Sequence, residues 1–225
     1  MDIDPDTDPR RLLRSLRVWD PSVTELTPFD PERAPDEPLP LFVEWFAAAV
    51  AAGEAEPHAV SLATADEEGR PDARIVLLHG AGPRGWSFAT HADSRKGRQL
   101  AARPRAALVF YWPTLGRQVR LRGPVTAATP PESHADLHAR SSGALAAALT
   151  GRQSGPLGSL DELTRASEEA WRRAEREPET PVPSWTLFRL RPSEVEFFQG
   201  EPRRRHVRLV YRRAGDGWDT GLLWP

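Results

Sequence analysis

The alternation of apolar and polar residues predicts that strands dominate this chain. Short runs with a period of two are typical of half-buried strands. They occur at residues 59–65, 70–79, 86–90, 105–112, 117–128, 185–192, 194–200, 206–213 and 217–225. These runs rarely alternate one-to-one with helical segments. We therefore expect a mainly β fold, a mostly antiparallel barrel with flanking helices, rather than a parallel doubly wound sheet.

Helical periodicity marks four segments between these runs. The first carries an aromatic stripe that is expected to be core, formed by Leu41, Phe42, Trp45, Phe46 and Ala49. The others run from about Ser94 to Ala102, from Pro130 to about Leu149, and over residues 159–177, where capping and charge pairs predict a surface helix.

The first 37 residues differ from the rest because they are rich in Pro, Asp and Arg. Only a short patch could pack on a core, and it consists of Leu12, Leu13, Leu16, Val18 and Trp19. A mobile arm is favoured over a lid that covers an active site. We therefore expect a flexible arm at residues 1–37 and one domain at residues 38–225.

Charge and composition exclude several classes of function. A net charge of −2 gives no drive toward nucleic acid or an anionic membrane. The absence of cysteine excludes disulfides, thiolate catalysis and Cys-ligated metals. There is no apolar run of membrane length and no N-terminal signal segment, so a cytoplasmic protein is expected.

An anion site is predicted where a strand and a helix begin. Arg95 and Lys96 occupy the first turn of a helix that Asp93 or Ser94 can cap. The helix dipole disfavours cations there by ~0.3–1 kcal/mol unless an anion compensates. With Arg74 at the start of a neighbouring strand, these cations predict a pocket for a phosphate monoester.

Other polar residues leave alternatives open. Gln118 alternates with Arg120 in a strand, where it could bond the edge of a planar heterocycle or simply face solvent. Gln153 and Ser154 lie in a Gly-flanked loop and could be plain turn residues. His134 and His138 are four residues apart, but no third ligand follows in a recognisable pattern, so no metal site is predicted.

A basic tract covers Arg203, Arg204, Arg205, His206 and Arg208. Such a run usually indicates nucleic-acid affinity or a solvated face. If the tract is a strand, Arg204, His206 and Arg208 share one face. That face would suit a planar anionic substrate, and a histidine there can transfer protons near neutral pH.

Several motifs occur in an order and at a spacing that resemble the pyridoxamine 5′-phosphate oxidase family of FMN-dependent oxidases. The resemblance covers about residues 38–225. It rests on RIVLL (74–78), FATHADSRKG (88–97), RQV (117–119), RQS (152–154), VEFFQG (195–200) and the 204–208 tract followed by Tyr211. It implies an FMN-binding split β-barrel that forms a homodimer, with two FMN sites at the subunit interface.

The resemblance also implies roles for individual residues. Residues implied to hold one side of FMN are Arg74, Ile75, Val76, Leu77, Leu78, Ala89, Thr90, Arg95 and Lys96. Gln118 would meet the isoalloxazine edge, and the other subunit would contribute Gln153, Ser154, Phe198 and Arg208. Arg204 and His206 fall on the family's catalytic Arg-x-His substrate pair.

The implied substrate pocket departs from the vitamin-type members of the family. Those members place Lys, Tyr and Ser where this chain has His79, Asp136 and Ala144, whereas Arg140 matches the family. A carboxylate beside a phosphate monoester is repulsive. The phenazine-biosynthesis branch also lacks that Lys and Tyr, and its members oxidise reduced, carboxylated nitrogen heterocycles.

The leading hypothesis is an FMN-dependent oxidase that transfers hydride from such a heterocycle to flavin N5, with O2 reoxidising the flavin and yielding H2O2. Its substrate would contact His79, Asp136, Arg140, Arg204 and His206. One alternative is a pyridoxine/pyridoxamine 5′-phosphate oxidase. A second is a split-barrel protein that binds flavin without turnover. The expected partners are a second copy of the chain, a small substrate and O2, with no nucleic acid and no membrane.

Overall fold

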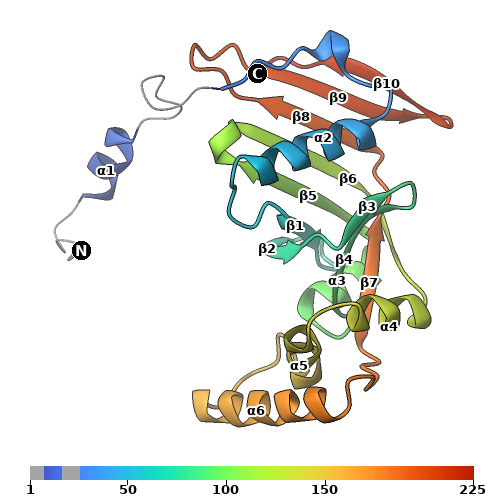
Figure 1. Ribbon diagram of the computed structural model, residues 1–225. Helices are drawn as coiled ribbons and strands as arrows, with labels where there is room; N and C mark the ends of the chain where they lie inside the picture. Colours follow the sequence, from blue (N-terminus) through green and yellow to red (C-terminus); the bar gives the residue numbers. More distant parts are fainter. Residues whose placement is uncertain (1–7, 17–25) are drawn as a thin grey trace.

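The computed structural model describes residues 8–16 and 26–225, and an antiparallel sheet organises them (Figure 1). The strands are β1 (Ala59–Ala65), β2 (Pro71–Leu77), β3 (Gly80–Gly82), β4 (Gly85–His91), β5 (Arg105–Trp112), β6 (Arg117–Ala127), β7 (Trp185–Leu190), β8 (Glu194–Gln199), β9 (Val207–Ala214) and β10 (Gly217–Leu222). The main path runs β10-β9-β8-β6-β5-β1-β2, while β7 joins β6 to β4 and β3 pairs with β4. The predicted mainly β, antiparallel architecture is confirmed.

Helices cover one face and one end of this sheet, apart from the first, whose residues are all exposed. They are α1 (Pro9–Ser15), α2 (Pro38–Ala51), α3 (Arg95–Ala102), α4 (Pro130–His138), α5 (Ser142–Thr150) and α6 (Leu160–Arg176), with short 3-10 turns at Pro31–Arg33 and Pro113–Leu115. Figure 1 shows α2 crossing the sheet and α3 to α6 gathered at its lower end. The single helical region predicted from Pro130 is two helices, because Ser141 starts α5 by accepting a hydrogen bond from the Ala144 N–H. None of the described helices is long and apolar enough to cross a membrane.

The aromatic stripe of α2 forms the centre of the core, as predicted. Trp45 is fully buried, with its ring 5.2 Å from that of Phe197 in an edge-to-face arrangement. Phe42 lies 5.1 Å from Phe110 of β5. Burying aromatic side chains of this size contributes a large share of the folding free energy, so α2 is fixed against the strands that carry the site.

The packed domain begins before residue 38. Phe29 packs edge-to-face on Trp45 at 5.1 Å, and the Tyr211 hydroxyl donates to the Pro35 carbonyl at 2.8 Å. These contacts correct the predicted boundary of the N-terminal arm. Leu12, Leu13 and Leu16 are exposed. The rest of the predicted arm, residues 1–7 and 17–25 with Val18 and Trp19, lies outside the described residues.

The basic tract is a turn, contrary to the conditional prediction of a strand. Pro202 has no N–H to donate to a ladder, and the Arg204 N–H closes the turn on the Glu201 carbonyl at 2.9 Å. Arg204 adopts a left-handed backbone with φ of 66°. Because β9 begins at Val207, Arg204, His206 and Arg208 do not share a strand face.

The sheet leaves an apolar patch on the face opposite α2. Ile75, Leu77 and Tyr111 expose 65%, 40% and 55% of their surface there. The strand register places all three on the same side of the sheet as Gln118. An apolar patch of this kind is typical of a protein interface, so this face is where a second copy is expected to bind.

Candidate active site

Three predicted cations meet at one corner, between the middle of β2 and the start of α3. Arg74 Nη1 donates to the Thr64 hydroxyl at 2.6 Å, and its Nη2 lies 2.7 Å from a carboxylate oxygen of Asp72. Arg95 Nε lies 3.3 Å from the same Asp72 oxygen. Lys96 is the third cation, and its ammonium faces the corner from the first turn of α3. The structure therefore brings together the group that the sequence proposed for a phosphate.

Gln153 and Ser154 lie at this same corner, in the same chain. Lys96 Nζ donates to the Thr90 hydroxyl at 3.1 Å and to Gln153 Oε1 at 2.9 Å. The Arg95 N–H donates to the Ser154 hydroxyl at 3.2 Å. The expectation that the other subunit contributes Gln153 and Ser154 here is therefore wrong, because the loop after α5 folds back onto α3 of its own chain.

The start of α3 is held close to β4 by two small residues. The Ser94 side chain is buried and accepts a hydrogen bond from the Gly97 N–H at 3.2 Å, which caps the helix as predicted. A Cβ atom at Gly97 would lie 2.3 Å from the Ala92 carbonyl oxygen. Only glycine allows α3 to begin this close to the preceding turn, which places Arg95 and Lys96 beside Arg74.

The corner carries an excess of positive charge. Burial lowers the pKa of Lys96, and the neighbouring Arg74 charge lowers it further. Burial raises the pKa of Asp72, but the hydrogen bond from Gln99 and the charges of Arg74 and Arg95 lower it overall, so the carboxylate is ionised. Three cations therefore face one carboxylate. This balance fits a phosphate monoester such as that of FMN.

The remaining residues implied on this side of FMN alternate along their strands. Ile75 and Leu77 point to the exposed face of the sheet, while Val76 and Leu78 pack against the core. Ala89 is half-buried on β4, opposite Leu187 of β7. The strand therefore presents a polar end at Arg74 and an apolar surface to a partner.

A second group forms a row across four strands. Tyr111, Gln118, Phe198 and Arg208 are successive cross-strand neighbours on β5, β6, β8 and β9. Arg208 is held by the buried Glu196, with Nε 2.8 Å from its carboxylate, and by the Trp224 carbonyl at 2.8 Å. In the sheet order, β1, β5 and β6 separate β8 from β2, so Phe198 and Arg208 lie several strands away from the cationic corner of their own chain.

The predicted catalytic pair lies next to this row. The His206 ring is 5.1 Å from the Phe198 ring, and the Glu201 N–H donates to His206 Nδ1 at 3.1 Å. Because a backbone N–H can only donate, neutral His206 carries its proton on Nε2. Arg204 precedes it in the left-handed turn.

A third group unites the other predicted substrate residues. His79 Nδ1 lies 3.0 Å from an Asp136 carboxylate oxygen, and Arg140 Nε lies 3.5 Å from the same oxygen. Burial raises the pKa of Asp136, but the hydrogen bond and charge of His79 and the charge of Arg140 lower it overall. The His79 ring stacks on Trp185 at 6.4 Å. Arg140 Nε is buried and makes no hydrogen bond among the described residues, although it faces the Asp136 carboxylate.

The sequence reasoning missed several residues that complete these groups. Asp72 stands two positions before Arg74, so strand alternation could have placed both on one face. Glu196 lies opposite Arg120 in the register, which a correct pairing of β6 with β8 would have indicated. Trp185 gave no signal in the sequence beyond its strand pattern.

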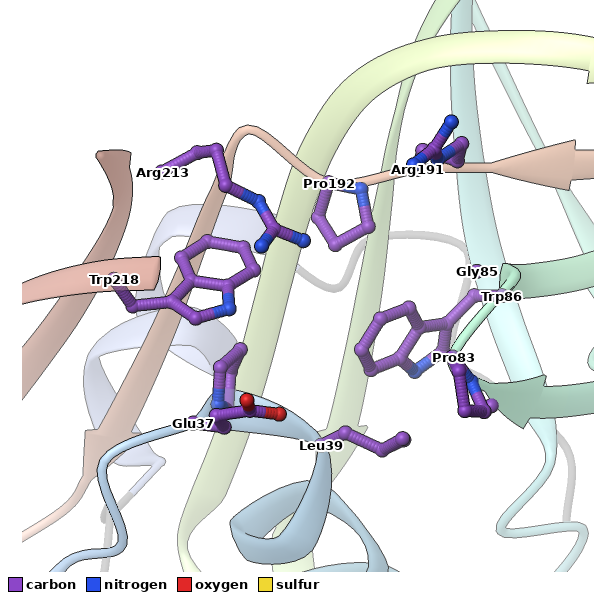
Figure 2. Close-up of a pocket in the computed structure, with 11 residues that line it drawn as sticks. Glu37, Leu39, Pro83, Gly85, Trp86, Arg191, Pro192, Arg213 and Trp218 are labelled. Atoms are coloured by element: carbon purple, nitrogen blue, oxygen red, sulfur yellow. The ribbon is translucent and has the colours of Figure 1, made fainter. Parts of the chain in front are cut away.

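A separate cavity of about 190 Å3 contains none of these residues (Figure 2). Trp86 and Trp218 lie on opposite sides of it, and the Arg213 guanidinium lies 4.2 Å from the Trp218 ring centre. The cavity therefore lies apart from the three groups described above.

Comparisons with known proteins agree with this geometry. A family model described as pyridoxamine 5′-phosphate oxidase matches residues 46–199. Another, described as the pyridoxine 5′-phosphate oxidase C-terminal dimerisation region, matches residues 185–225. The pyridoxine/pyridoxamine 5′-phosphate oxidase of Rubrobacter xylanophilus is 44% identical over 85% of this chain and 88% of its own. That of Anaeromyxobacter dehalogenans is 42% identical over 88% of this chain and 100% of its own.

Solved structures give the same picture. PhzG from Burkholderia lata 383, in complex with tetrahydrophenazine-1-carboxylic acid, aligns with a TM-score of 0.83 at 32% identity, covering 89% of this chain and 99% of its own. An FMN-binding protein from Nostoc punctiforme shares the fold, with a TM-score of 0.66 at 23% identity, over 88% of this chain and 98% of its own. The split-barrel fold and the homodimer predicted from the sequence are confirmed.

Proposed function

Because this chain belongs to the pyridoxamine 5′-phosphate oxidase family, with FMN as its cofactor, we propose that it oxidises a reduced nitrogen heterocycle that carries a carboxylate. The observation that supports this proposal is the group of His79, Asp136 and Arg140, in which an ionised carboxylate stands where vitamin-type members have a tyrosine. PhzG, whose structure contains a carboxylated tetrahydrophenazine, supports a substrate of this class.

The cationic corner would hold the FMN phosphate. Arg74, Arg95 and Lys96 supply the charge, and the Thr90 hydroxyl is already bonded to Lys96. The partner copy would contribute the row of Gln118, Phe198 and Arg208, since one chain does not bring that row to its own corner. When bound, FMN would supply the redox chemistry, a two-electron oxidation of the substrate with O2 as the final electron acceptor.

Arg204 and His206 would position the substrate. The Arg204 guanidinium would bind the carboxylate, ideally with two parallel hydrogen bonds. His206 would donate a hydrogen bond from Nε2, because the Glu201 N–H already occupies Nδ1. Protonating Nδ1 would break that bond, so His206 is better suited to donate and to orient than to take up a proton at Nδ1.

The charge of the pocket favours a carboxylate over a phosphate. Where vitamin-type members have a lysine and a tyrosine, this chain has the His79–Asp136 pair. Two unit charges about 4 Å apart have an interaction energy of about 4 kcal/mol at an effective dielectric constant near 20. The ionised Asp136 would therefore oppose a phosphate dianion about twice as strongly as a carboxylate monoanion, and Arg140 offsets either repulsion only in part.

A second candidate is a pyridoxine/pyridoxamine 5′-phosphate oxidase. The specific observation in its favour is the 42% and 44% identity to curated relatives of that name. In this case Arg140 would grip the substrate phosphate. His79 would have to be protonated to replace the missing lysine.

Anaerobic reduction of the bound flavin distinguishes the candidates. The purified dimer is mixed with a dihydrophenazine carboxylate or with pyridoxamine 5′-phosphate, and bleaching of the flavin absorbance is followed. We expect bleaching by the former, recovery of colour on admitting air, and release of H2O2. Saturable turnover of pyridoxamine 5′-phosphate at micromolar concentration would favour the second candidate, and no bleaching by any substrate would favour a protein that binds flavin without turnover.

Two variants test the assigned roles. Arg204→Ala is expected to raise KM for the carboxylated substrate at least about tenfold, because a charge-assisted pair is lost, while bound FMN is unchanged. Asp136→Asn removes the repulsive charge and should increase kcat/KM for pyridoxamine 5′-phosphate. Loss of FMN from the Arg204 variant would contradict its assignment to substrate.

A further inference from the structure

The structure adds a third ligand to the histidine pair that the sequence left incomplete. His134 and His138 of α4 face Glu179, which lies in the segment between α6 and β7. One potential ligand atom from each residue lies within 4.8 Å of the others. His134 Nε2 is 3.9 Å from a Glu179 carboxylate oxygen, and the two imidazole rings are 3.9 Å apart between centres. We propose that His134, His138 and Glu179 bind a divalent transition-metal ion of the Zn2+ type.

The hydrogen bonds of His138 suit a metal ligand. Its Nδ1 lies 2.8 Å from the His134 carbonyl oxygen, which can only accept, so Nδ1 carries a proton. Nε2 of the neutral ring then offers its lone pair. Histidines that bind metals usually donate their other N–H to a carbonyl or carboxylate in this way. The Thr180 carbonyl, 3.2 Å from Nε2, also can only accept, so a metal ion bound at Nε2 would replace the proton that this contact holds.

The ligand atoms lie within 4.8 Å of one another, so they must approach by up to about 1.4 Å around an ion. Ligand atoms at 2.0–2.1 Å from a tetrahedral Zn2+ lie about 3.4 Å from one another. The His134–Glu179 pair at 3.9 Å must approach by about half an ångström for this geometry. Both side chains can do so, since they expose 43% and 83% of their surface. Two imidazoles and one carboxylate favour Zn2+, Co2+ or Ni2+ over the harder Mg2+ and Ca2+.

The site lies on the other side of α4 from the substrate group. Asp136 and Arg140 follow His134 and His138 by two positions, which is about 200° around a helix. His134 also lines a groove of about 430 Å3 with Leu137, Val182 and Trp185. A metal would therefore tie α4 to the segment that leads into β7, without touching the residues assigned to substrate.

Isothermal titration of Zn2+ into the FMN-loaded, tag-free dimer tests the proposal. Before titration, the protein is treated with a chelator and the chelator is removed. The variants His134→Ala and Glu179→Gln remove one ligand each. Glu175→Gln is the matched control, because it makes the same charge change at an exposed position of α6 and leaves all three ligands. The flavin absorbance verifies that each variant is folded.

We expect one Zn2+ per chain in the wild type and in Glu175→Gln, with a rise in melting temperature on binding. Zn2+ affinity should fall at least about tenfold in His134→Ala and in Glu179→Gln. Removing only the hydrogen-bond partner of a metal ligand already weakens binding by about that factor, and removing the ligand itself should weaken binding at least as much. Absence of saturable binding at this stoichiometry, or an affinity in both ligand variants equal to that of the wild type, would overturn the proposal. Because flavin content and Zn2+ binding are read separately, a wrong oxidase assignment would leave this result untouched.

Discussion

Replacing Lys96 by methionine should have opposite effects on FMN binding and on the stability of the flavin-free protein. The ammonium of Lys96 is partly buried, where burial and the Arg74 charge lower its pKa. A base whose pKa is lowered by folding destabilises the folded state while it is charged. This cost in folding free energy is present below the pKa that Lys96 has in the folded state. It disappears as the pH rises above 10.5, the ordinary pKa of a lysine. At neutral pH the methionine therefore removes a cost from the flavin-free protein.

The loss in FMN affinity follows from the bond that disappears. A hydrogen bond to a charged group contributes about 1.5–3 kcal/mol, and each 1.4 kcal/mol is about tenfold in affinity. We therefore expect Lys96→Met to weaken FMN binding about 10- to 150-fold. The substitution also removes the hydrogen bonds of Lys96 to Thr90 and Gln153. We therefore expect the flavin-free variant to be as stable as the flavin-free wild type or slightly more stable, rather than much more stable.

Two titrations on flavin-free protein measure these effects. Quenching of flavin fluorescence gives the FMN dissociation constant, and urea denaturation gives the free energy of unfolding. Arg98→Met is the matched control, because Arg98 lies on the same helix, is exposed and loses the same charge. Solvent screens exposed charges, so the control should change FMN affinity by less than about threefold. An unchanged FMN affinity in Lys96→Met, or a loss of stability as large as the loss of binding energy, would refute the assignment of Lys96 to the phosphate.

Three further predictions follow from other parts of the structure. Hydrogen bonds, chiefly the one from Arg189, lower the pKa of Glu132 from 4.5 to about 2. The contribution of ionised Glu132 to the stability of the folded protein is therefore lost as the pH falls through that range. Glu132→Gln should therefore show a smaller decline in stability between those pH values, measured by urea denaturation, and an equal decline would contradict this. Gly97→Ala should destabilise the protein by about 1–3 kcal/mol and weaken FMN binding, because the new methyl group meets the Ala92 carbonyl; calorimetry and FMN titration check both. Ile75→Asp should convert the dimer to a folded monomer in light scattering, since it places a charge on the exposed apolar face, and a persistent dimer would exclude that face as the interface.

Local patterns carry much of the fold. Strand alternation located Val119 and Leu121 on the buried side of β6 and Gln118 on the other. Helical spacing identified the α2 stripe as core, and Ser94 was one of two residues proposed as a cap. These features depend on residues within one or two turns of each other, so the local sequence indicates them without any knowledge of long-range contacts.

The basic tract shows where local patterns fail. Its alternation of Arg and His is compatible with a strand, yet Pro202 and a left-handed Arg204 make it a turn. The Gln153 loop is a second case, because only its return to α3 shows that it belongs to the cationic corner of its own chain. A sequence pattern states which face a residue can share, but not which distant segment will pack there.

The sequence by itself determined the family, the strand order along the chain, and the residue types of a phosphate site. The tertiary structure alone decided which residues meet. His79 and Asp136 are 57 positions apart, and His134 finds Glu179 only because α6 returns the chain to α4. The physical reason is that the residue type alone fixes the charge and hydrogen-bonding groups of a side chain. Its partners, in contrast, depend on the strand register and helix packing that the whole core sets.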